Sequence, residues 1–325
     1  MKMKDRMRRK TILRTMLGRV TGLIGLVCLC GCLSSILGPC TAQAEDVWML
    51  AVSVGKGDAL LLGVGDAVCL IDTGYPYVRG RILSAMREMG VEKLEAVLIT
   101  HTDKDHEGGL AWLSESEIPV GSWYASGYCL DYEKADHPVT EAAAARGQEV
   151  IWLLAGDSVP LGSGRLQVLA PVKPATDKDD NNSLVMMLET AEGRILLTGD
   201  LEEAGEEPLL DSGVSLFCDV LKVANHGDGD ASSKAFLQEA RPKAAVISTN
   251  SDEKPGTPDG KVLSRLAKLG TTVACTEDAS LGVLVTLSGG QPEMKLLDRV
   301  QQAWPVSIAA IDAELDLITL RCSGG

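Results

Sequence analysis

The segment from Thr100 to Gly109 reads Thr-His-Thr-Asp-Lys-Asp-His-Glu-Gly-Gly and places two histidines and two aspartates within six residues. It follows the apolar run 94–99, which predicts a buried β-strand, and a helix is expected to begin near Gly108. A loop at the end of a buried strand can direct several side chains to one point, as a metal ion requires. Helix capping would account for one aspartate and for neither histidine. The segment therefore predicts a metal site at a strand end.

Two further segments have the same local context. The apolar run 194–198 leads to Asp200, and the apolar run 218–224 leads to His226. Taken alone, Asp200 is equally well explained as the N-cap of a helix beginning near Glu202, and His226 as a turn residue. Three strand ends that each carry a metal-ligating type of side chain favour one shared metal centre.

Short apolar runs alternate with helical patterns along most of the chain. The first three runs are separated by Gly and Asp and predict an antiparallel meander over 47–54, 59–64 and 67–71. Further strands are expected at 94–99, 149–153, 166–170, 184–189, 194–198, 220–223, 244–248, 271–275 and 282–287, and helices at 79–89, 135–146, 202–210, 233–240 and 258–269. This order favours one domain of two sheets with outer helices.

The composition is that of a globular protein. Of 325 residues, 45% are hydrophobic and 23% are charged, which is enough to bury a sizeable core. Aromatic residues make up only 4%, which argues weakly against a module that binds single-stranded nucleic acid by base stacking. His137 belongs to no motif and is expected at the surface.

Residues 1–44 have the features of an export signal. They contain eight Lys and Arg residues and one Asp, with the apolar run 20–38 ahead of the small-residue site Ala42-Gln43-Ala44. An uncleaved membrane anchor is an alternative, because about 18 apolar residues approach the length that spans a bilayer. Cys32 lies in a segment that resembles a bacterial lipobox, which would make the protein a lipoprotein. Each alternative places the rest of the chain outside the cytoplasm, either secreted or membrane-anchored.

The ordered motifs resemble the metallo-β-lactamase superfamily, and within it the extracellular hydrolase domain of ComEC-type DNA-uptake proteins and their secreted stand-alone relatives. The resemblance covers about residues 47–287. Its motifs are Ser53-Val54-Gly55-Lys56-Gly57-Asp58-Ala59, Leu70-Ile71-Asp72-Thr73-Gly74, the box from His101 to Gly109, Asp180-Asn181-Asn182-Ser183-Leu184-Val185, Leu197-Thr198-Gly199-Asp200 and Lys222-Val223-Ala224-Asn225-His226-Gly227. It implies a four-layer αββα sandwich of the α/β (α+β) class.

The export signal and the resemblance together set the expected domain boundaries. Residues 1–44 form the export signal or membrane anchor, residues 45–290 form the hydrolase domain, and residues 291–325 form a C-terminal extension without an assigned role.

The resemblance also implies two divalent metal ions. It assigns the first ion to His101, Asp103 and Asp200, and the second to Asp105, His106, His226 and a bridging Asp200. Asp105 is in addition the expected catalytic residue, because it would help to orient a hydroxide held between the two ions. Zinc is the first expectation, and manganese and iron are also admissible because the ligand set is rich in oxygen.

Four further residues are expected to lie around the ligands, namely Asp58, Asp72, Asn182 and Ser183. For Asp58 and Asp72, a role in orienting the ligand loop and plain turn capping are equal alternatives.

Two positions depart from the family pattern. Asn225 and Thr257 stand where the family usually has His. Lost histidines that contact or protonate the substrate would weaken or redirect activity, whereas His226 is still expected to bind metal.

Three functions follow. The first, which the resemblance implies, is metal-dependent hydrolysis of phosphodiester bonds in nucleic acid. The net charge of −14 includes +7 from residues 1–44, so the remainder carries −21, which opposes a polyanionic substrate. A hydrolase of a small ester, lactone, amide or phosphoester is therefore the second. The third is a surface protein that binds metal with weakened catalysis or none.

Overall fold

A computed structural model describes residues 45–129, 137–175 and 178–299. The chain divides into two units after Ala44, and only the second contains described residues. The expected export segment 1–44 and the end of the chain from residue 300 lie outside the described residues. No helix within the described ranges is long and apolar enough to cross a membrane.

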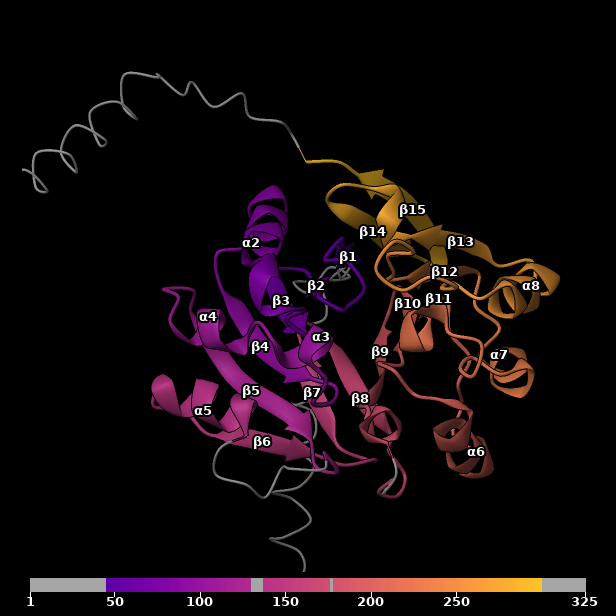
Figure 1. Ribbon diagram of the computed structural model, residues 1–325, viewed down its shortest axis with the longest axis horizontal. Helices are drawn as coiled ribbons and strands as arrows, with labels where there is room; N and C mark the ends of the chain where they lie inside the picture. The colour runs from indigo at the N-terminus through magenta and orange to yellow at the C-terminus, as the bar shows by residue number, and fades with distance from the viewer. Residues whose placement is uncertain (1–44, 130–136, 176–177, 300–325) are drawn as a thin grey trace, which may run out of the picture. The chain divides into compact units, whose positions relative to one another are not determined.

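Two mixed sheets form the centre of the described unit (Figure 1). The first sheet has the order β15-β14-β1-β2-β3-β4-β5-β6. Its strands are β1 Val47–Val52, β2 Leu60–Val64, β3 Ala67–Ile71, β4 Leu94–Ile99, β5 Val120–Ser126, β6 Val150–Leu153, β14 Gly282–Ser288 and β15 Gln291–Leu297. The expected meander is confirmed, because β1, β2 and β3 pair antiparallel in sequence. From β3 to β6 the neighbouring strands are parallel.

The second sheet has the order β13-β12-β11-β10-β9-β8-β7. Its strands are β7 Ser158–Leu161, β8 Gly164–Ala170, β9 Val185–Thr190, β10 Gly193–Leu197, β11 Val220–Lys222, β12 Ala244–Ile247 and β13 Thr272–Cys275. Strands β10 to β13 are parallel, whereas β7 to β10 pair antiparallel.

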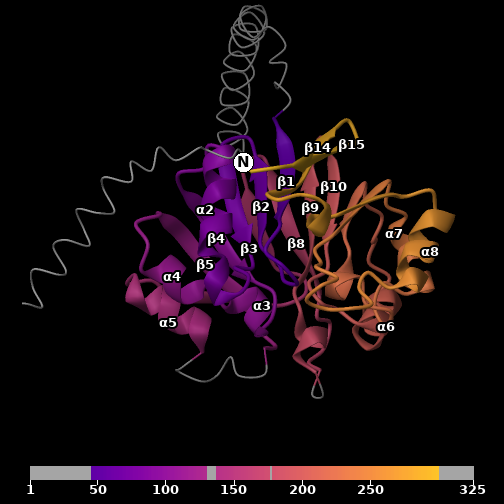
Figure 2. The same ribbon diagram turned by 45° about the horizontal axis from the view of Figure 1, so that its top comes forward.

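Helices cover the outer face of each sheet (Figure 2). The helices and 3₁₀ turns of the described residues are η1 Pro76–Val78, α2 Arg79–Glu88, α3 Lys104–Glu107, α4 Leu110–Ser114, α5 Pro138–Ala145, η2 Asp179–Asn182, α6 Glu203–Asp211, η3 Ala224–Gly227, α7 Lys234–Ala240, α8 Gly260–Lys268 and η4 Thr276–Asp278. One apolar cluster lies between the sheets, a second joins the first sheet to α2, α4 and α5, and a third joins the second sheet to α6, α7 and α8. The predicted αββα sandwich is thus confirmed.

Strand β1 shows why the apolar runs are continuous. All six of its residues are buried. Met49 packs into the cluster between the sheets, and the next residue, Leu50, packs into the cluster under the helices. A strand buried on both faces has no polar alternation, so its sequence reads as an uninterrupted apolar run.

Three strands lie where the sequence predicts none, namely β5, β7 and β15. Strand β15 pairs along its whole length with β14, so the sheet continues to Leu297, beyond residue 290, where the hydrolase domain is expected to end. It is an edge strand with mostly exposed or half-buried side chains, and Pro292 and two charged residues interrupt its pattern. Such an edge strand lacks the apolar run that identifies a central strand.

The prediction for His137 is wrong. Its side chain is 2% exposed, and it caps the N-terminus of α5 by accepting a hydrogen bond from the Val139 N–H. Pro138 follows His137, and proline is a common first residue of a helix. The proline therefore indicated that His137 is the N-cap of a helix and does not lie in an open loop.

Candidate metal centre

Parallel strands of both sheets end at the same place in the fold. Asp72 follows β3, His101 follows β4, Asp200 follows β10 and His226 lies in η3 after β11. Strands β3 and β4 are parallel neighbours in one sheet, and β10 and β11 are parallel neighbours in the other. Because the carboxyl ends of parallel strands share one edge of a sheet, segments more than 100 residues apart deliver their polar side chains to one site.

Helix α3 supplies the remaining ligand candidates of the motif. Asp103 is its N-cap residue, and Asp105 and His106 lie in its single turn. The Gly108 that follows has no room for a side chain, because a Cβ there would lie 2.3 Å from the Lys104 carbonyl oxygen and 2.7 Å from Pro76. The two glycines of the box therefore let this short helix pack tightly against the loop after β3.

The ligand candidates lie within coordination distance of one another. Asp200 Oδ2 lies 3.3 Å from His106 Nε2 and 3.0 Å from His226 Nε2. Asp105 Oδ2 lies 3.5 Å from the same nitrogen of His226. The ring centroids of His101 and His106 are 4.1 Å apart. Asp200 thus stands between histidines that come from different sheets.

Three buried groups of donor atoms result, each with its atoms within 4.8 Å of one another. One of them, Asp58, Asp72 and His106, includes the Asp72 carboxylate that already contacts His106 Nδ1. The other two groups share His106. The first contains His101, His106 and Asp200, and the second contains Asp105, His106 and His226. Within the described residues Asp103 joins neither of them. It groups instead with His101 and Asp180, and its own side chain is exposed.

The outer nitrogen of each histidine is held by the protein. His106 Nδ1 lies 2.8 Å from Asp72 Oδ2, and His226 Nδ1 lies 2.9 Å from the Ser248 carbonyl oxygen. His101 Nδ1 lies 3.2 Å from Ser183 Oγ. These contacts fix the ring orientations and turn each Nε2 toward the centre, which is the arrangement typical of metal-ligating histidines.

The inward-facing atoms fit a cation. The Nε2 atoms of His101, His106 and His226 and the Oδ1 atom of Asp200 are buried and make no hydrogen bond. A buried polar atom without a partner costs about 1–3 kcal/mol. Imidazole nitrogens and carboxylate oxygens are ligands of zinc, and the same set admits manganese and iron. The donor set therefore fits divalent metal ions.

The electrostatics favour the ionised carboxylates. Burial raises the pKa of Asp200, but His226 and His106 outweigh burial and hold this pKa well below its usual value. Burial lowers the pKa of His106, and Asp200 and Asp72 outweigh it, so the pKa of His106 lies well above its usual value. Burial and the neighbouring His106 lower the pKa of His101. Carboxylates that stay ionised are the form that binds cations.

The four residues expected around the ligands have different roles. Asp72 accepts hydrogen bonds from the Thr100 N–H and hydroxyl as well as contacting His106. Ser183 Oγ contacts His101 and accepts the Asp200 N–H at 3.1 Å, so it links two ligand candidates. Both residues orient the ligands.

Asn182 and Asp58 lie further out. The Asn182 side chain bonds to the backbone of Ala175 and to Asp179, and it supports the loop before β9. Asp58 Oδ2 pairs with Lys222 Nζ at 2.7 Å, and both side chains are buried. Asp58 contacts the ligand loop through its backbone, because its N–H donates to the Asp105 carbonyl.

Asp180 is a candidate ligand that the sequence prediction missed. Its Oδ1 lies 3.7 Å from His101 Nε2. Burial raises its pKa to about 7, and the nearby Asp200 and Asp103 act in the same direction. Asp180 begins the motif Asp180-Asn181-Asn182-Ser183, whose last two residues were expected to lie around the ligands. Its acidic side chain at this position could have indicated a ligand.

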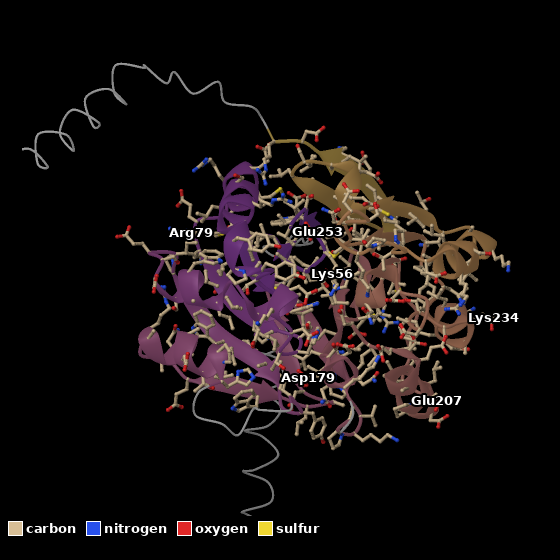
Figure 3. The ribbon with its side chains drawn as sticks, in the orientation of Figure 1. Lys56, Arg79, Asp179, Glu207, Lys234 and Glu253 are labelled. Carbon is tan, nitrogen blue, oxygen red and sulfur yellow. The ribbon has the colours of Figure 1, made fainter. Side chains whose placement is uncertain are left out.

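Two lysines were also missed. Lys222 is fully buried. It lies inside the apolar run 218–224, and a lysine in such a run requires a buried carboxylate as its partner, which could have indicated the ion pair. Lys56 Nζ forms an ion pair with Asp105 Oδ2. Figure 3 shows Lys56 at the middle of the molecule, where the indigo half of the ribbon meets the orange half.

The two residues that depart from the family pattern both contact other residues of the protein. Asn225 is buried, adopts a positive φ of 44°, and its Nδ2 lies 3.4 Å from Glu202 Oε1. Thr257 Oγ1 lies 3.0 Å from the hydroxyl of Thr249. Each of the two side chains therefore has a polar contact with another side chain of the protein.

Comparisons with known proteins identify the family of this chain. Residues 52–251 match the metallo-beta-lactamase superfamily. The chain is 28% identical over 257 residues to ComE operon protein 3 of Bacillus subtilis (strain 168), which covers 74% of this chain and 33% of that protein. It is 30% identical over 213 residues to competence protein ComA of Neisseria gonorrhoeae, which covers 65% of this chain and 28% of that protein. The chain thus spans about a third of the length of these curated relatives.

Among solved structures, CmlA, a diiron beta-hydroxylase from Streptomyces venezuelae, covers 76% of this chain and 54% of its own at 12% identity and a TM-score of 0.48. The region matched by the superfamily contains all the ligand candidates and the residues that orient them. The chain belongs to the metallo-beta-lactamase superfamily.

Proposed function

We propose that this protein hydrolyses phosphodiester bonds of nucleic acid with two bound divalent metal ions. The observation that carries the proposal is the set of buried, unbonded inward atoms of His101, His106, Asp200 and His226. The substrate class is supported by the relatives, which bear the names competence protein ComA and, in Haemophilus influenzae, recombination protein 2. Zinc is the first expectation for the ions, ahead of manganese and iron.

When bound, divalent ions lower the pKa of water and neutralise negative charge that develops on phosphoryl oxygens. His101 and Asp200 would hold one ion, and Asp105, His106 and His226 would hold the other, because Nε2 of His106 can bind only one ion while its Nδ1 contacts Asp72. Asp72, Ser183 and the Ser248 carbonyl keep the imidazole rings fixed, so that no reorganisation is needed when substrate enters. Asp105 can accept a hydrogen bond from the attacking water and so orient it.

Hydrolysis of a small uncharged ester or lactone is the second candidate. It is favoured by the net charge of −21 carried by residues 45–325, since affinity for nucleic acid normally rests on Lys and Arg contacts. Carboxylates also dominate the surroundings of the metal centre, among them Asp103, Asp180 and Glu202.

Elemental analysis of the purified protein, joined to a substrate panel, separates the candidates. The panel contains a single-stranded oligonucleotide, bis(p-nitrophenyl) phosphate, p-nitrophenyl acetate and a lactone, each with and without a chelator. Cleavage of the first two, lost with chelator, supports the proposal. Activity confined to the acetate or the lactone supports the second candidate, and bound metal without any turnover indicates a metal-binding protein.

The variant Asp200→Asn tests the ligand assignment. It removes the carboxylate that stands between His106 and His226, so we expect metal content and turnover to fall together. The control is Asp211→Asn, which neutralises an exposed aspartate at the end of α6 and should change neither. Turnover that persists in Asp200→Asn with metal lost would contradict metal-dependent hydrolysis.

We also propose that residues 1–44 direct export and that the protein acts outside the cytoplasm. Cell fractionation followed by mass spectrometry of the N-terminus tests this. A mature chain that begins at Glu45 indicates a cleaved signal, lipid on Cys32 indicates a lipoprotein, and an intact N-terminus in the membrane fraction indicates an anchor. An intact chain in the cytoplasm would exclude export.

A further inference from the structure

Lys56 lies at the solvent side of the metal centre. It belongs to the loop between β1 and β2, and its Nζ forms an ion pair with Asp105 Oδ2. The same oxygen lies 3.5 Å from His226 Nε2. The lysine side chain is 20% exposed, whereas the Asp105 side chain is 6% exposed. Lys56 therefore reaches a ligand candidate from the side that solvent and substrate can approach.

The backbone holds Lys56 in this position. Its N–H donates to Glu253 Oε2 at 2.8 Å, and Figure 3 shows Glu253 beside it. A Cβ on the next residue, Gly57, would lie 2.8 Å from the Asp105 carbonyl oxygen, so only glycine permits this close packing. The Asp58 N–H donates to the same carbonyl at 3.1 Å. The loop is thus attached to helix α3, and the ammonium group stays next to the centre.

Lys56 has hydrogen-bond donors to spare. An ammonium group carries three N–H donors, and in the described part of the chain Lys56 Nζ makes one hydrogen bond, to Asp105. Lys222, another lysine near the centre, is fully buried and bonds both Asp58 and the Val223 carbonyl. Lys56, unlike Lys222, can thus donate to a molecule entering from solvent while it remains paired with Asp105.

The charge pattern indicates what such a molecule is. The carboxylates of Asp105, Asp180 and Asp200 surround the donor atoms and would be balanced by bound divalent ions. A phosphodiester then brings one further negative charge, which a carboxylic ester lacks. A lysine with free donors at the entrance compensates that charge, and it contributes nothing comparable to a neutral ester.

We propose that Lys56 binds a non-bridging oxygen of the substrate phosphoryl group and makes the site select anionic phosphodiesters over neutral esters. The inference rests on the proposed phosphodiesterase function and names the residue that sets its substrate class. The competing explanation is that Lys56 only positions Asp105.

The test compares Lys56→Met, which keeps the length of the side chain without its charge, with Lys56→Arg and the control Lys243→Met. Lys243 is also paired with an aspartate, Asp219. This pair lies away from the metal centre, because Lys243 also bonds the Gly290 carbonyl in the turn between β14 and β15. Three quantities are measured on zinc-loaded protein. They are metal content, the dissociation constant of inorganic phosphate by calorimetry, and kcat/KM for bis(p-nitrophenyl) phosphate and p-nitrophenyl acetate.

We expect Lys56→Met to retain its metal. It should bind phosphate about 10- to 100-fold more weakly, because it loses one hydrogen bond to a charged group. Its kcat/KM for the phosphodiester should fall by a similar factor. Acetate hydrolysis should stay within about twofold, and Lys56→Arg should recover most of the phosphate affinity. Equal losses for both substrates, or loss of metal, would show that Lys56 only positions Asp105.

The two proposals fail in different ways. If the unaltered protein cleaves bis(p-nitrophenyl) phosphate and Lys56→Met does so equally well, the Lys56 inference is wrong and the phosphodiesterase function stands. If the unaltered protein does not cleave it while Lys56→Met still weakens phosphate binding, the proposed function is wrong and the anion-binding role of Lys56 stands.

Discussion

At the scale of single residues, the Lys222–Asp58 pair is the buried contact with the clearest expected effect on stability. Both side chains are almost completely buried, and Nζ lies 2.7 Å from Oδ2. Lys222→Met leaves a buried carboxylate without its counter-charge, so we expect the free energy of unfolding to fall by about 3–5 kcal/mol. Chemical denaturation measures this difference.

The double variant Lys222→Met with Asp58→Asn serves as the comparison, because it removes both charges and should recover much of the loss. The control Lys243→Met breaks a pair whose lysine is 42% exposed and should cost at most about 1 kcal/mol. A loss in Lys222→Met no larger than in the control would contradict a stabilising role for the buried pair.

Residues that carry chemistry were predictable where the motif places them on strand ends. His101, Asp200 and His226 converge as the sequence indicates, because each follows a buried apolar strand, and His106 joins them from the short helix α3. Asp180 was not predictable in the same way, because its distance to His101 depends on how the 3₁₀ turn η2 packs against the loop after β4. Sequence spacing along one segment carries no information on such packing between segments.

At the scale of secondary-structure elements, the contact between α6 and α7 predicts a pH dependence. Glu206 of α6 is buried, and both of its carboxylate oxygens accept the Ser233 N–H at the N-terminus of α7. Burial raises its pKa from 4.5 to about 7, and Glu203 acts in the same direction. Between these two pH values the folded protein keeps a proton that the unfolded chain has released. The free energy of unfolding therefore falls as pH rises from 4.5 to about 7, by an amount on the order of 1–3 kcal/mol.

Glu206→Gln should remove this dependence while its amide oxygen still accepts the Ser233 N–H, so the variant should be the more stable protein at pH 8. Thermal unfolding between pH 5 and 8 measures the difference. Glu207→Gln is the matched control, since Glu207 is the next residue and its side chain extends outward from α6 (Figure 3). If the stability of Glu206→Gln still depended steeply on pH, groups other than Glu206 would cause that dependence.

Elements buried on both faces were easier to predict than those at the edges of sheets. Strands β1, β2 and β9 read as apolar runs because they are covered by the other sheet and by helices. Strand β15 is an edge strand and β7 contains Pro160, so neither has a long apolar run. Their places in the sheets follow from pairing with β14 and β8, which the sequence pattern does not encode.

At the scale of the whole molecule, the metal centre joins the two sheets. His101 and His106 are carried by the first sheet and the helix that follows β4, whereas Asp200 and His226 are carried by the second sheet. Ions held by both sets of ligands cross-link the halves of the sandwich, and the bound state exists only when both halves are folded. Metal binding should therefore stabilise the entire described fold rather than one loop.

We accordingly expect the melting temperature of chelator-treated protein to rise when zinc is added. At a free metal concentration 100 times the dissociation constant, the gain is about 2.7 kcal/mol, which for a fold of this size corresponds to roughly 5–10 °C. Asp200→Asn should melt at the same temperature with and without zinc, because it lacks the carboxylate between the two halves. The contrary result is an unchanged melting temperature, with zinc protecting only a few amides near α3 against hydrogen exchange. In that case the residues that follow β10 and β11 would take no part in metal binding, and the ions would not cross-link the sheets.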